Sequence, residues 1–410
     1  MRWIYNLGIF GYYLLVRIVS VRNEKARKWL EGRKDIFKRL SDTIIPGDQI
    51  LWFHASSLGE FEQGRPVIEA IRKLWPEYKI LLTFFSPSGY ELRKNYPYAD
   101  YIFYLPLDTK RNASRFIKIV RPKKVFFIKY EFWYNFLTQL KEENIPTYIF
   151  SALFRPSQVF FKPWGKWYLK AIASYEHIFV QNQESYDLLH KYGFRNVSLS
   201  GDTRLDRVGQ IADAAPRLEK LEFFCGDQRA IIAGSTWKED EDLFIPYVNK
   251  SPNGLKFVIA PHEVTPQTLE RISNSVGKSY VFYSTASQDD LVNADVLIAD
   301  GYGYLNSIYR YGMLAYVGGG FNSGIHSILE PAVFGLPVIF GPDYHKFQEA
   351  FDMLDLGAAT CINDGAELES EIETFRLNPE KLLNASHIAR GYVDKNRGAS
   401  NEIVKYLFHT

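Results

Sequence analysis

Short, almost continuously apolar runs alternate along this chain with longer stretches whose apolar residues recur at helical spacing. Such apolar runs are typical of strands buried on both faces of a parallel sheet, with helices between them. In the first half, strands are predicted at 49–55, 79–84, 101–105, 124–130, 147–151 and 177–181. Helices are predicted between them, for example at 60–75 and 109–120. The pattern then restarts, with strands predicted at 229–234, 256–260, 295–299, 314–318 and 337–340.

Two such series predict an α/β protein with two Rossmann-like, doubly wound domains. A charged helical stretch at 206–224 separates the series, and a last helix is predicted over about 379–407, packing back across the domains. The resulting division is an N-terminal segment, two domains and a C-terminal helix, at 1–25, 26–206, 207–385 and 386–410. Ligands of doubly wound sheets bind beyond the carboxyl ends of the strands, so we expect the active site in a cleft between the domains.

The N-terminal segment is apolar and aromatic from residue 3 to residue 16, and a basic cluster follows it: Arg17, Arg22, Lys25, Arg27 and Lys28. A membrane span needs about 20 apolar residues, so this stretch is too short to cross a bilayer comfortably. Two interpretations remain: a helix lying in the membrane interface, or a buried first helix of the domain. The aromatic and basic composition favours the interface helix.

Bulk composition narrows the class of protein. Hydrophobic residues make up 46% of the 410 residues, which predicts large folded cores. Lys and Arg total 49 against 47 for Asp and Glu, so a bulk nucleic-acid binder is not expected. Cys225 and Cys361 are far apart in the sequence, which argues against a disulfide or a structural zinc site.

Three charged residues follow predicted strands of the first half. Glu60 falls in the first turn of a helix after Ser56 and Ser57, where the helix dipole favours an ionised carboxylate. Such a group is either a catalytic base or only a stabilising charge. Glu131 follows another strand and serves either catalysis or an ion pair with the nearby Lys129. Arg204 meets either a ligand phosphate or a neighbouring carboxylate, Asp202 or Asp206.

The second half contains candidate nucleotide-binding residues after its strands. Gly234, Ser235 and Thr236 precede a helix whose free amides would form an anion site, without a Walker A or GxGxxG pattern. Asp240 and Asp242 form a DxD pattern, for which dipole complementarity is a better explanation than metal binding. After Gly318, Gly319 and Gly320, His326 and Ser327 lie one helical turn before Glu330. Glu330 suits a ribose diol, and the glycines would admit a ligand to the backbone.

With these motifs the chain resembles the 3-deoxy-D-manno-octulosonic acid (Kdo) transferases of lipopolysaccharide synthesis over nearly its whole length. The motifs are HASSLGE (54–60), TFFSPSGYE (83–91), KYEFWYN (129–135), FSALFRPSQ (150–158), GDTRLDRV (201–208), AGSTW (233–237), VGGGF (317–321) and HSILEPAVFGLPVIFGP (326–342). The resemblance implies a GT-B glycosyltransferase, with an acceptor-binding first domain and a nucleotide-sugar-binding second domain.

The resemblance also implies site residues. Glu60 would be the catalytic base, with Glu131 and Arg204 assisting the transition state. Contacts to the CMP-sugar would come from Pro261, His262, Tyr302, Gly303, Tyr304, Ser327, Ile328, Leu329 and Glu330. Many relatives carry Arg where this chain has His262 and Asn where it has Ser327, so the chemistry of these contacts differs here.

The implied reaction moves Kdo from CMP-Kdo to a sugar hydroxyl of a lipid A precursor (lipid IVA), with inversion and without a metal or cofactor. The expected location is the cytoplasmic face of the inner membrane, where Arg155, Lys162 and Lys166 meet either acceptor phosphates, anionic lipid or only solvent. Two alternatives are a nucleotide-sugar epimerase and a membrane-associated nucleotide-sugar-binding protein without catalysis. The number of Kdo units transferred cannot be read from these motifs.

Overall fold

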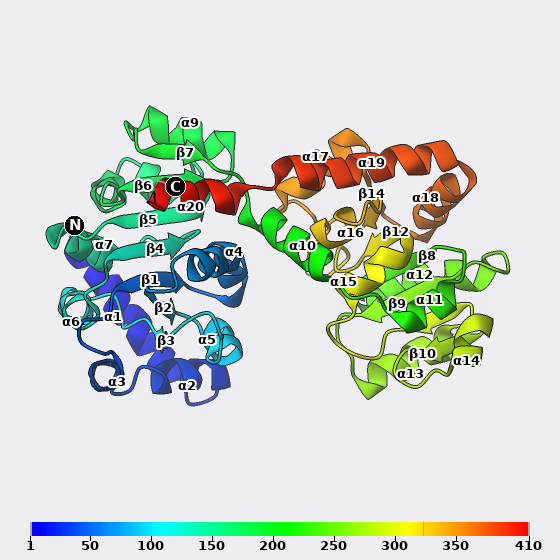
Figure 1. The fold of residues 1–410 in the computed structure, drawn as a ribbon, viewed down its shortest axis with the longest axis horizontal. Coiled ribbons are helices and arrows are strands. Elements are labelled where there is room, and N and C mark those ends of the chain that lie inside the picture. Colours follow the sequence, from blue (N-terminus) through cyan, green and yellow to red (C-terminus); the bar gives the residue numbers. More distant parts are fainter. Residues whose placement is uncertain (1, 323, 409–410) are drawn as a thin grey trace. The chain divides into compact units, whose positions relative to one another are not determined.

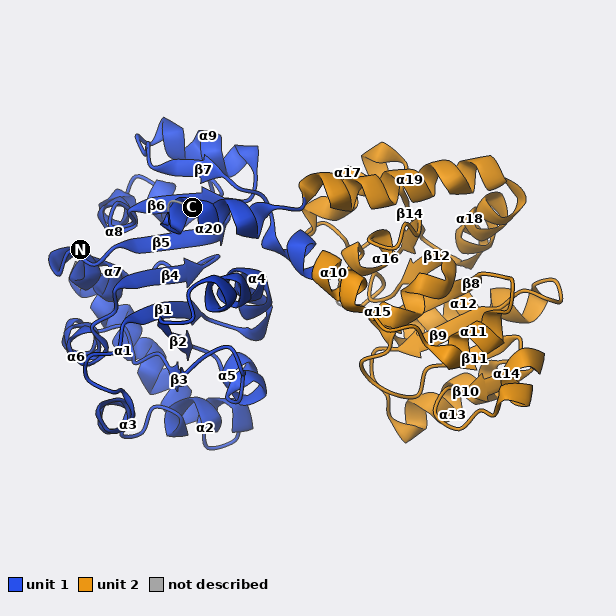
Figure 2. Cartoon of the chain, in the orientation of Figure 1, with its two compact units in different colours: residues 1–207, 397–410 blue, residues 208–396 orange. Residues whose placement is uncertain are grey.

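A computed structural model describes residues 2–322 and 324–408 of the chain, which forms two compact units (Figures 1 and 2). Unit 1 comprises residues 1–207 and 397–410, and unit 2 comprises residues 208–396. Unit 2 is therefore inserted in the sequence of unit 1. The first crossing between the units falls inside helix α10 (Thr203–Ala214).

Unit 1 is built on a seven-stranded parallel sheet with the order β3-β2-β1-β4-β5-β6-β7. Its strands are β1 (Ile50–Ala55), β2 (Lys79–Phe84), β3 (Tyr101–Tyr104), β4 (Lys124–Ile128), β5 (Thr147–Ala152), β6 (His177–Val180) and β7 (Val197–Leu199). The strand order reverses between β1 and β4: β2 and β3 extend the sheet on one side of this pair, and β5, β6 and β7 extend it on the other. A crevice at the carboxyl ends of these two strands is the expected ligand position in such sheets.

Helices cover both faces of this sheet, and each face has its own apolar core. The helices of unit 1 are α1 (Arg2–Val19), α2 (Glu24–Glu31), α3 (Ile36–Thr43), α4 (Leu58–Leu74), α5 (Pro87–Arg93), α6 (Lys110–Val120), α7 (Tyr134–Glu142), η1 (Val159–Phe161), η2 (Lys166–Tyr168), α8 (Leu169–Ile172), α9 (Gln183–Lys191) and α20 (Ala399–Phe408). One core packs the sheet against α3, α6, α7 and α8, and the other packs it against α4 and α20.

Unit 2 repeats the parallel architecture with the strand order β10-β11-β9-β8-β12-β13-β14. Its strands are β8 (Ala230–Thr236), β9 (Phe257–Pro261), β10 (Tyr280–Phe282), β11 (Val296–Ile298), β12 (Gly312–Val317), β13 (Val338–Phe340) and β14 (Ala359–Cys361). The order reverses between β8 and β12, so the equivalent crevice lies at their carboxyl ends. Both cysteines of this unit are free.

The helices of unit 2 again lie on both faces of the sheet. After α10 they are α11 (Glu219–Cys225), α12 (Lys238–Lys250), α13 (Pro266–Ser275), α14 (Gln288–Asn293), α15 (Leu305–Ile308), η3 (Tyr309–Tyr311), α16 (Leu329–Ala332), α17 (Gln348–Leu356), α18 (Gly365–Leu377) and α19 (Pro379–Asn396). The prediction of two Rossmann-like parallel-sheet domains is therefore confirmed.

Helix α1 has one face on unit 1 and the other in solvent. On the inner face, the Tyr5 hydroxyl donates to Asp108, and Tyr12 contacts Trp29 with ring centroids 5.7 Å apart. On the outer face, large apolar side chains are 41–70% exposed: Trp3, Ile4, Leu7, Phe10, Leu14, Leu15 and Ile18. Among the described residues, no helix combines the length and the apolar character that a membrane span requires.

The single terminal helix predicted over about 379–407 is wrong, because the chain breaks between α19 and α20. Gly398 has φ 116°, a left-handed conformation that glycine adopts without strain. Asp206 fixes the break by accepting hydrogen bonds from the amides of Gly398 (2.6 Å) and Ser400 (2.8 Å). The last helix, α20, then packs on α4 within unit 1, where Phe408 stacks on Trp75 at 3.9 Å.

Candidate active site

In unit 1, the strand β1 leads into α4, whose third residue is Glu60. Ser57 caps the helix, and its amide and hydroxyl donate to Oε2 of Glu60 at 2.8 and 3.1 Å. Among the described residues, the other oxygen, Oε1, receives no hydrogen bond. The helix start therefore fixes the Glu60 carboxylate and leaves one oxygen available to a ligand.

The surroundings of Glu60 disfavour its charge. Burial raises the pKa of Glu60 most, and repulsion by the Glu131 carboxylate raises it further, whereas Ser57 and Lys129 lower it. The net result is a pKa raised from 4.5 to about 7. A carboxylate with this pKa is a competent base near neutral pH, because it is ionised yet binds a proton readily. Lys129 has φ 73°, a costly conformation for a residue with a side chain.

Glu131 is buried, with 1% of its surface exposed, and is held on three sides. Its Oε1 accepts from the Ser56 amide at 2.8 Å, and its Oε2 accepts from the Trp133 indole and lies 3.3 Å from Nε2 of His54. These contacts fix the Glu131 carboxylate, whose charge acts on Glu60.

Sequence reasoning left His54 without a role, although it lies in the HASSLGE motif. Its Nδ1 is 3.0 Å from the carbonyl oxygen and 2.9 Å from the hydroxyl of Thr83. Its Nε2 lies 3.3 Å from Oε2 of Glu131, and among the described residues this nitrogen forms no hydrogen bond. His54 thus lies between Thr83 of β2 and the Glu131 carboxylate. The signal available in the sequence was a histidine inside an otherwise apolar strand.

Tyr130 is affected by the charges of the other predicted site residues of unit 1. Burial raises the pKa of its phenol, and the charges of Arg155, Glu60 and Arg204 also act on it. Arg204 itself is bound to Asp202, with Nε and NH2 2.7 and 2.6 Å from Oδ2. The salt bridge with Asp202, one of the two interpretations of Arg204, is therefore present. The charges of Glu60 and Arg204 thus both act on Tyr130, the residue before Glu131.

In unit 2, the loop after β12 is braced by Asp240 of α12. This carboxylate is buried and accepts from the amides of Trp237 and Gly319, both at 2.9 Å, and from the Tyr316 hydroxyl at 2.6 Å. The Asp240 of the DxD pattern is therefore a helix cap, and Asp242 pairs with Lys238. The amides expected to be free for an anion are partly used, because Asp240 occupies the amide of residue 237.

The glycines of this loop, Gly318 to Gly320, serve the packing of the chain itself. A Cβ atom on Gly318 would lie 2.4 Å from the Ser235 carbonyl oxygen, and one on Gly320 would lie 2.6 Å from Gly341. Gly319 has φ 94°. Neighbouring backbone thus fills the space that a side chain at Gly318 or Gly320 would need.

Three rings stack at the carboxyl ends of β8 and β9. His262 lies against Trp237 and His326, with centroid distances of 4.7 and 4.3 Å. The Trp237 indole donates to Nε2 of His326 at 3.1 Å, so the proton of the neutral imidazole is on Nδ1. Burial and His262 lower the pKa of His326, and Asp240 opposes them. Pro261 ends β9 directly before this stack.

Glu330 is the second residue of the short helix α16 and is partly buried. Burial raises its pKa from 4.5 to about 7, and among the described residues neither carboxylate oxygen has a hydrogen-bond partner. Its charge acts on Tyr309, whose hydroxyl would lie 2.1 Å from a Cβ atom on Gly234. Glu330 and Gly234 thus flank the same tyrosine, and an unsatisfied carboxylate there suits a ligand with hydroxyl donors.

The other predicted contacts differ in availability. Ile328 and Leu329 are buried in the core, with 1% and 2% exposed, so only their backbone can meet a ligand. Ser327 is exposed. Tyr302 is 70% exposed and accepts from the Val264 amide at 2.9 Å, and Gly303 beside it has φ 90°. Tyr304 packs on Tyr283 with centroids 4.8 Å apart.

Two Rossmann-like parallel-sheet domains with these crevices resemble the GT-B class of glycosyltransferases. The same fold is found in the UDP-GlcNAc 2-epimerase of Neisseria meningitidis bound to UDP-GlcNAc (TM-score 0.62, 15% identity, 88% of this chain and 100% of that chain). It is also found in the MurG protein of Acinetobacter baumannii (TM-score 0.57, 12% identity, 88% of this chain and 100% of that one). At these identities the likeness concerns the fold alone.

In sequence, the chain is similar to enzymes of one family. Residues 28–207 match the family model of 3-deoxy-D-manno-octulosonic-acid transferase (Kdo transferase). The chain is 27% identical over 413 residues to the Kdo transferase of Haemophilus influenzae (96% of this chain, 93% of the relative). It is 26% identical over 356 residues to that of Aquifex aeolicus (83% and 89%). In sequence the chain is therefore similar to the Kdo transferases, a glycosyltransferase family, over most of its length, and this likeness favours Kdo transfer over the epimerase and the non-catalytic alternatives.

Proposed function

We propose that this protein transfers Kdo from CMP-Kdo to a hydroxyl of a lipid A precursor, such as lipid IVA, with inversion at the anomeric carbon. The observation that carries the proposal is Glu60, a fixed carboxylate with one available oxygen and a pKa raised to about 7, inside the Kdo transferase domain. These are the properties of a general base that acts on a sugar hydroxyl at neutral pH.

In the proposed reaction, Glu60 takes the proton from the acceptor hydroxyl as its oxygen attacks the anomeric carbon of Kdo. The bond from that carbon to the phosphate oxygen of CMP breaks, and CMP leaves with the electron pair. A single displacement of this kind inverts the anomeric centre. Glu60 then returns its proton to water.

Unit 2 is the proposed donor site. Glu330, with its unsatisfied oxygens, accepts from the ribose hydroxyls. His326 offers its Nδ1–H, and His262, which stands where many relatives have Arg, stacks beside it. They supply donors to an anionic sugar nucleotide where Asp240 already occupies the backbone amides of Trp237 and Gly319. Arg204 and Arg155 serve the charged groups on the unit 1 side.

The expected location is the cytoplasmic face of the inner membrane. Helix α1 supports it, because its outer face carries exposed apolar side chains at 3, 7, 10, 14 and 18, one stripe of the helix. A helix fixed to its domain by Tyr5 and exposing such a stripe fits an interfacial anchor. The anchor would bring the unit 1 crevice to a lipid acceptor.

The test is an incubation of the protein with CMP-Kdo and a tetraacyl lipid A precursor, followed by mass spectrometry of the lipid. Addition of Kdo by the native protein, and a loss of at least a hundredfold in rate for Glu60→Gln with the fold retained, are the expected results. Near-native turnover by that variant would remove Glu60 from the reaction. Absence of any transfer by the native protein would overturn the proposed function. An NMR assignment of the new linkage distinguishes inversion from retention.

A further inference from the structure

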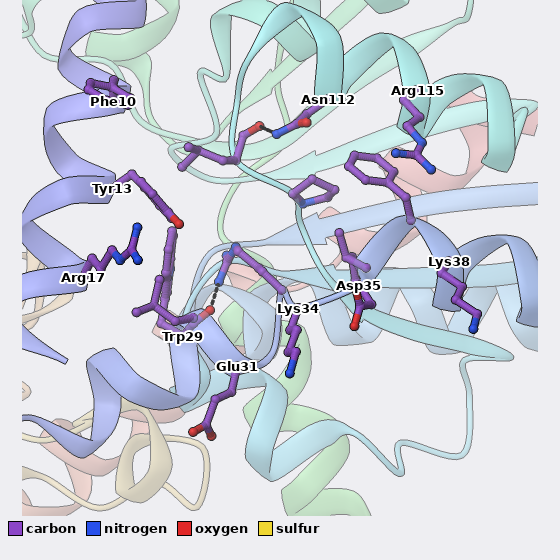
Figure 3. Close-up of a pocket in the computed structure, with 16 residues that line it drawn as sticks. Phe10, Tyr13, Arg17, Trp29, Glu31, Lys34, Asp35, Lys38, Asn112 and Arg115 are labelled. Atoms are coloured by element: carbon purple, nitrogen blue, oxygen red, sulfur yellow. Dashed lines mark hydrogen bonds between the residues drawn. The ribbon is translucent and has the colours of Figure 1, made fainter. Parts of the chain in front are cut away.

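A cavity of about 1040 Å³ opens on unit 1 between α1, the α2–α3 hairpin and the start of α6 (Figure 3). Its floor is apolar and includes Trp29, Leu30, Phe37 and Leu107. Tyr13 and Arg17 project into it from α1 (Figure 3). We call it the α1 groove. An apolar floor of this size suits an acyl chain or another extended hydrophobic group.

The rim of the α1 groove is basic. Five cationic and two acidic side chains line it, and Arg33 among the cations is already used, donating to the carbonyls of Trp29, Phe85 and Leu105. The other four are Arg17, Lys34, Lys38 and Arg115. Within the described part of the chain, none of these four forms an ion pair with a carboxylate. Arg115 lies over the ring of Phe37, with its Cζ 4.5 Å from the centroid. The groove thus combines an apolar floor with cations available to an anion.

A continuous set of aromatic contacts joins the α1 groove to the candidate base. The ring of Trp29 contacts Phe85 at 5.5 Å, and Phe85 contacts Trp133 at 4.8 Å. The Trp133 indole donates to Glu131, whose charge acts on Glu60. Phe85 and Leu105, which bind Arg33, directly follow β2 and β3. The groove therefore lies along the same carboxyl edge of the sheet as Glu60.

We propose that the α1 groove binds the phosphorylated, acylated part of the lipid acceptor, so that its sugar hydroxyl reaches Glu60. This inference rests on the proposed function and adds where the acceptor is held. The rim cations meet phosphate oxygens, and the floor takes an acyl chain. A bulk membrane phospholipid would suit the same chemistry, but the shared edge with Glu60 favours the acceptor itself.

The test compares two triple variants that each remove three positive charges from unit 1. The groove variant is Lys34→Gln/Lys38→Gln/Arg115→Gln. The control variant is Lys118→Gln/Lys123→Gln/Lys191→Gln, at exposed positions outside the groove. Transfer is measured with detergent-dispersed acceptor, so that membrane attachment does not limit the rate. A dephosphorylated acceptor is the matched substrate.

We expect the groove variant to raise the KM for the phosphorylated acceptor at least tenfold, with kcat changed less than threefold. The control variant should change KM less than twofold. With the dephosphorylated acceptor, the groove variant and the native protein should have equal KM values. Equal effects of the two variants, or the same loss with both acceptors, would overturn the proposal.

Two further measurements distinguish acceptor binding in the α1 groove from catalysis and from phospholipid binding. Equilibrium binding of the phosphorylated acceptor, without donor, tests acceptor binding in the groove even if no transfer occurs. If only the groove variant then binds the acceptor more weakly, acceptor binding in the groove is supported although the proposed function fails. Binding to phosphatidylglycerol vesicles tests the phospholipid alternative. If the groove variant loses vesicle binding but keeps its acceptor KM, the occupant is a membrane phospholipid and the proposal is refuted.

Discussion

Replacing Glu60 by glutamine should stabilise unit 1 at neutral pH although it abolishes turnover. Folding raises the pKa of this carboxyl from 4.5 to about 7, which means that the folded protein prefers the protonated form. The stabilising contribution of the proton is complete below pH 4.5 and is lost as the pH rises to about 7. Above pH 7 the carboxylate is ionised in both states, and its cost stays constant. Glutamine is neutral throughout and has none of this cost.

The magnitude follows from the two pKa values. A difference of about 2.5 in pKa corresponds to about 3 kcal/mol at alkaline pH, at 1.36 kcal/mol for each unit. Between pH 5 and pH 8, the stability of Glu60→Gln relative to the native protein should therefore rise by about 2–3 kcal/mol. The glutamine oxygen can still accept from the Ser57 amide, which now donates to Oε2 of Glu60.

The assay is urea unfolding at several pH values, followed by tryptophan fluorescence. Seven of the eight tryptophans lie in unit 1, Trp237 being the exception, so the signal reports on the right unit. Glu77→Gln is the matched control, because Glu77 is an exposed carboxylate in the turn after α4. A stability difference that stays flat from pH 5 to pH 8, or one shared by the control, would show that Glu60 does not have the assigned environment.

Three other outcomes are expected. Glu330→Ala should weaken cytidine binding by roughly 1.5–3 kcal/mol. The affinity of the native protein for cytidine should fall below pH 7, because Glu330 then takes up a proton. Calorimetry with phosphate-free cytidine checks both, and an unchanged affinity of the variant would mean that Glu330 has only a structural role. Transfer should persist in excess EDTA, because the described residues hold no group of three metal-ligating side chains and CMP leaves with one phosphate; a loss that magnesium restores would contradict this. Leu7→Gln/Leu15→Gln/Ile18→Gln should shift the protein to the soluble fraction of sedimented vesicles at least tenfold while cytidine binding is kept, and undiminished vesicle binding would argue against α1 as the anchor.

The sequence pattern located the strands that carry the site, because they are buried on both faces and almost continuously apolar. It missed β7, β10 and β14, which have three residues each and lie at the edges of their sheets. Short edge strands bury little surface, so their side chains do not follow a strong apolar pattern. Such strands become visible only when a neighbouring strand is in place.

Local signals also predicted the position of Glu60, since the serines before it and the helix after it are contiguous in sequence. Its environment was not predictable, because Glu131 acts on it across the fold and lies against His54 of another segment. The same distinction holds in unit 2. The place of Asp240 in a first helical turn was readable, but its bond to the Gly319 amide, 79 residues away, was not. Contacts that join separate strands determine pKa values, and a single sequence does not contain their geometry.

Because the chain returns to unit 1 at α20, unit 1 can complete its fold only after unit 2 has been translated. The core of unit 1 includes Ile403, Val404 and Leu407, which are translated only after all of unit 2. On the ribosome, unit 2 can finish folding while unit 1 still exposes the face of α4 that α20 covers. The nascent unit 1 therefore exposes apolar surface until α20 has been translated. A stop codon that removes only α20 would leave the later-made unit intact and damage the unit that was made first.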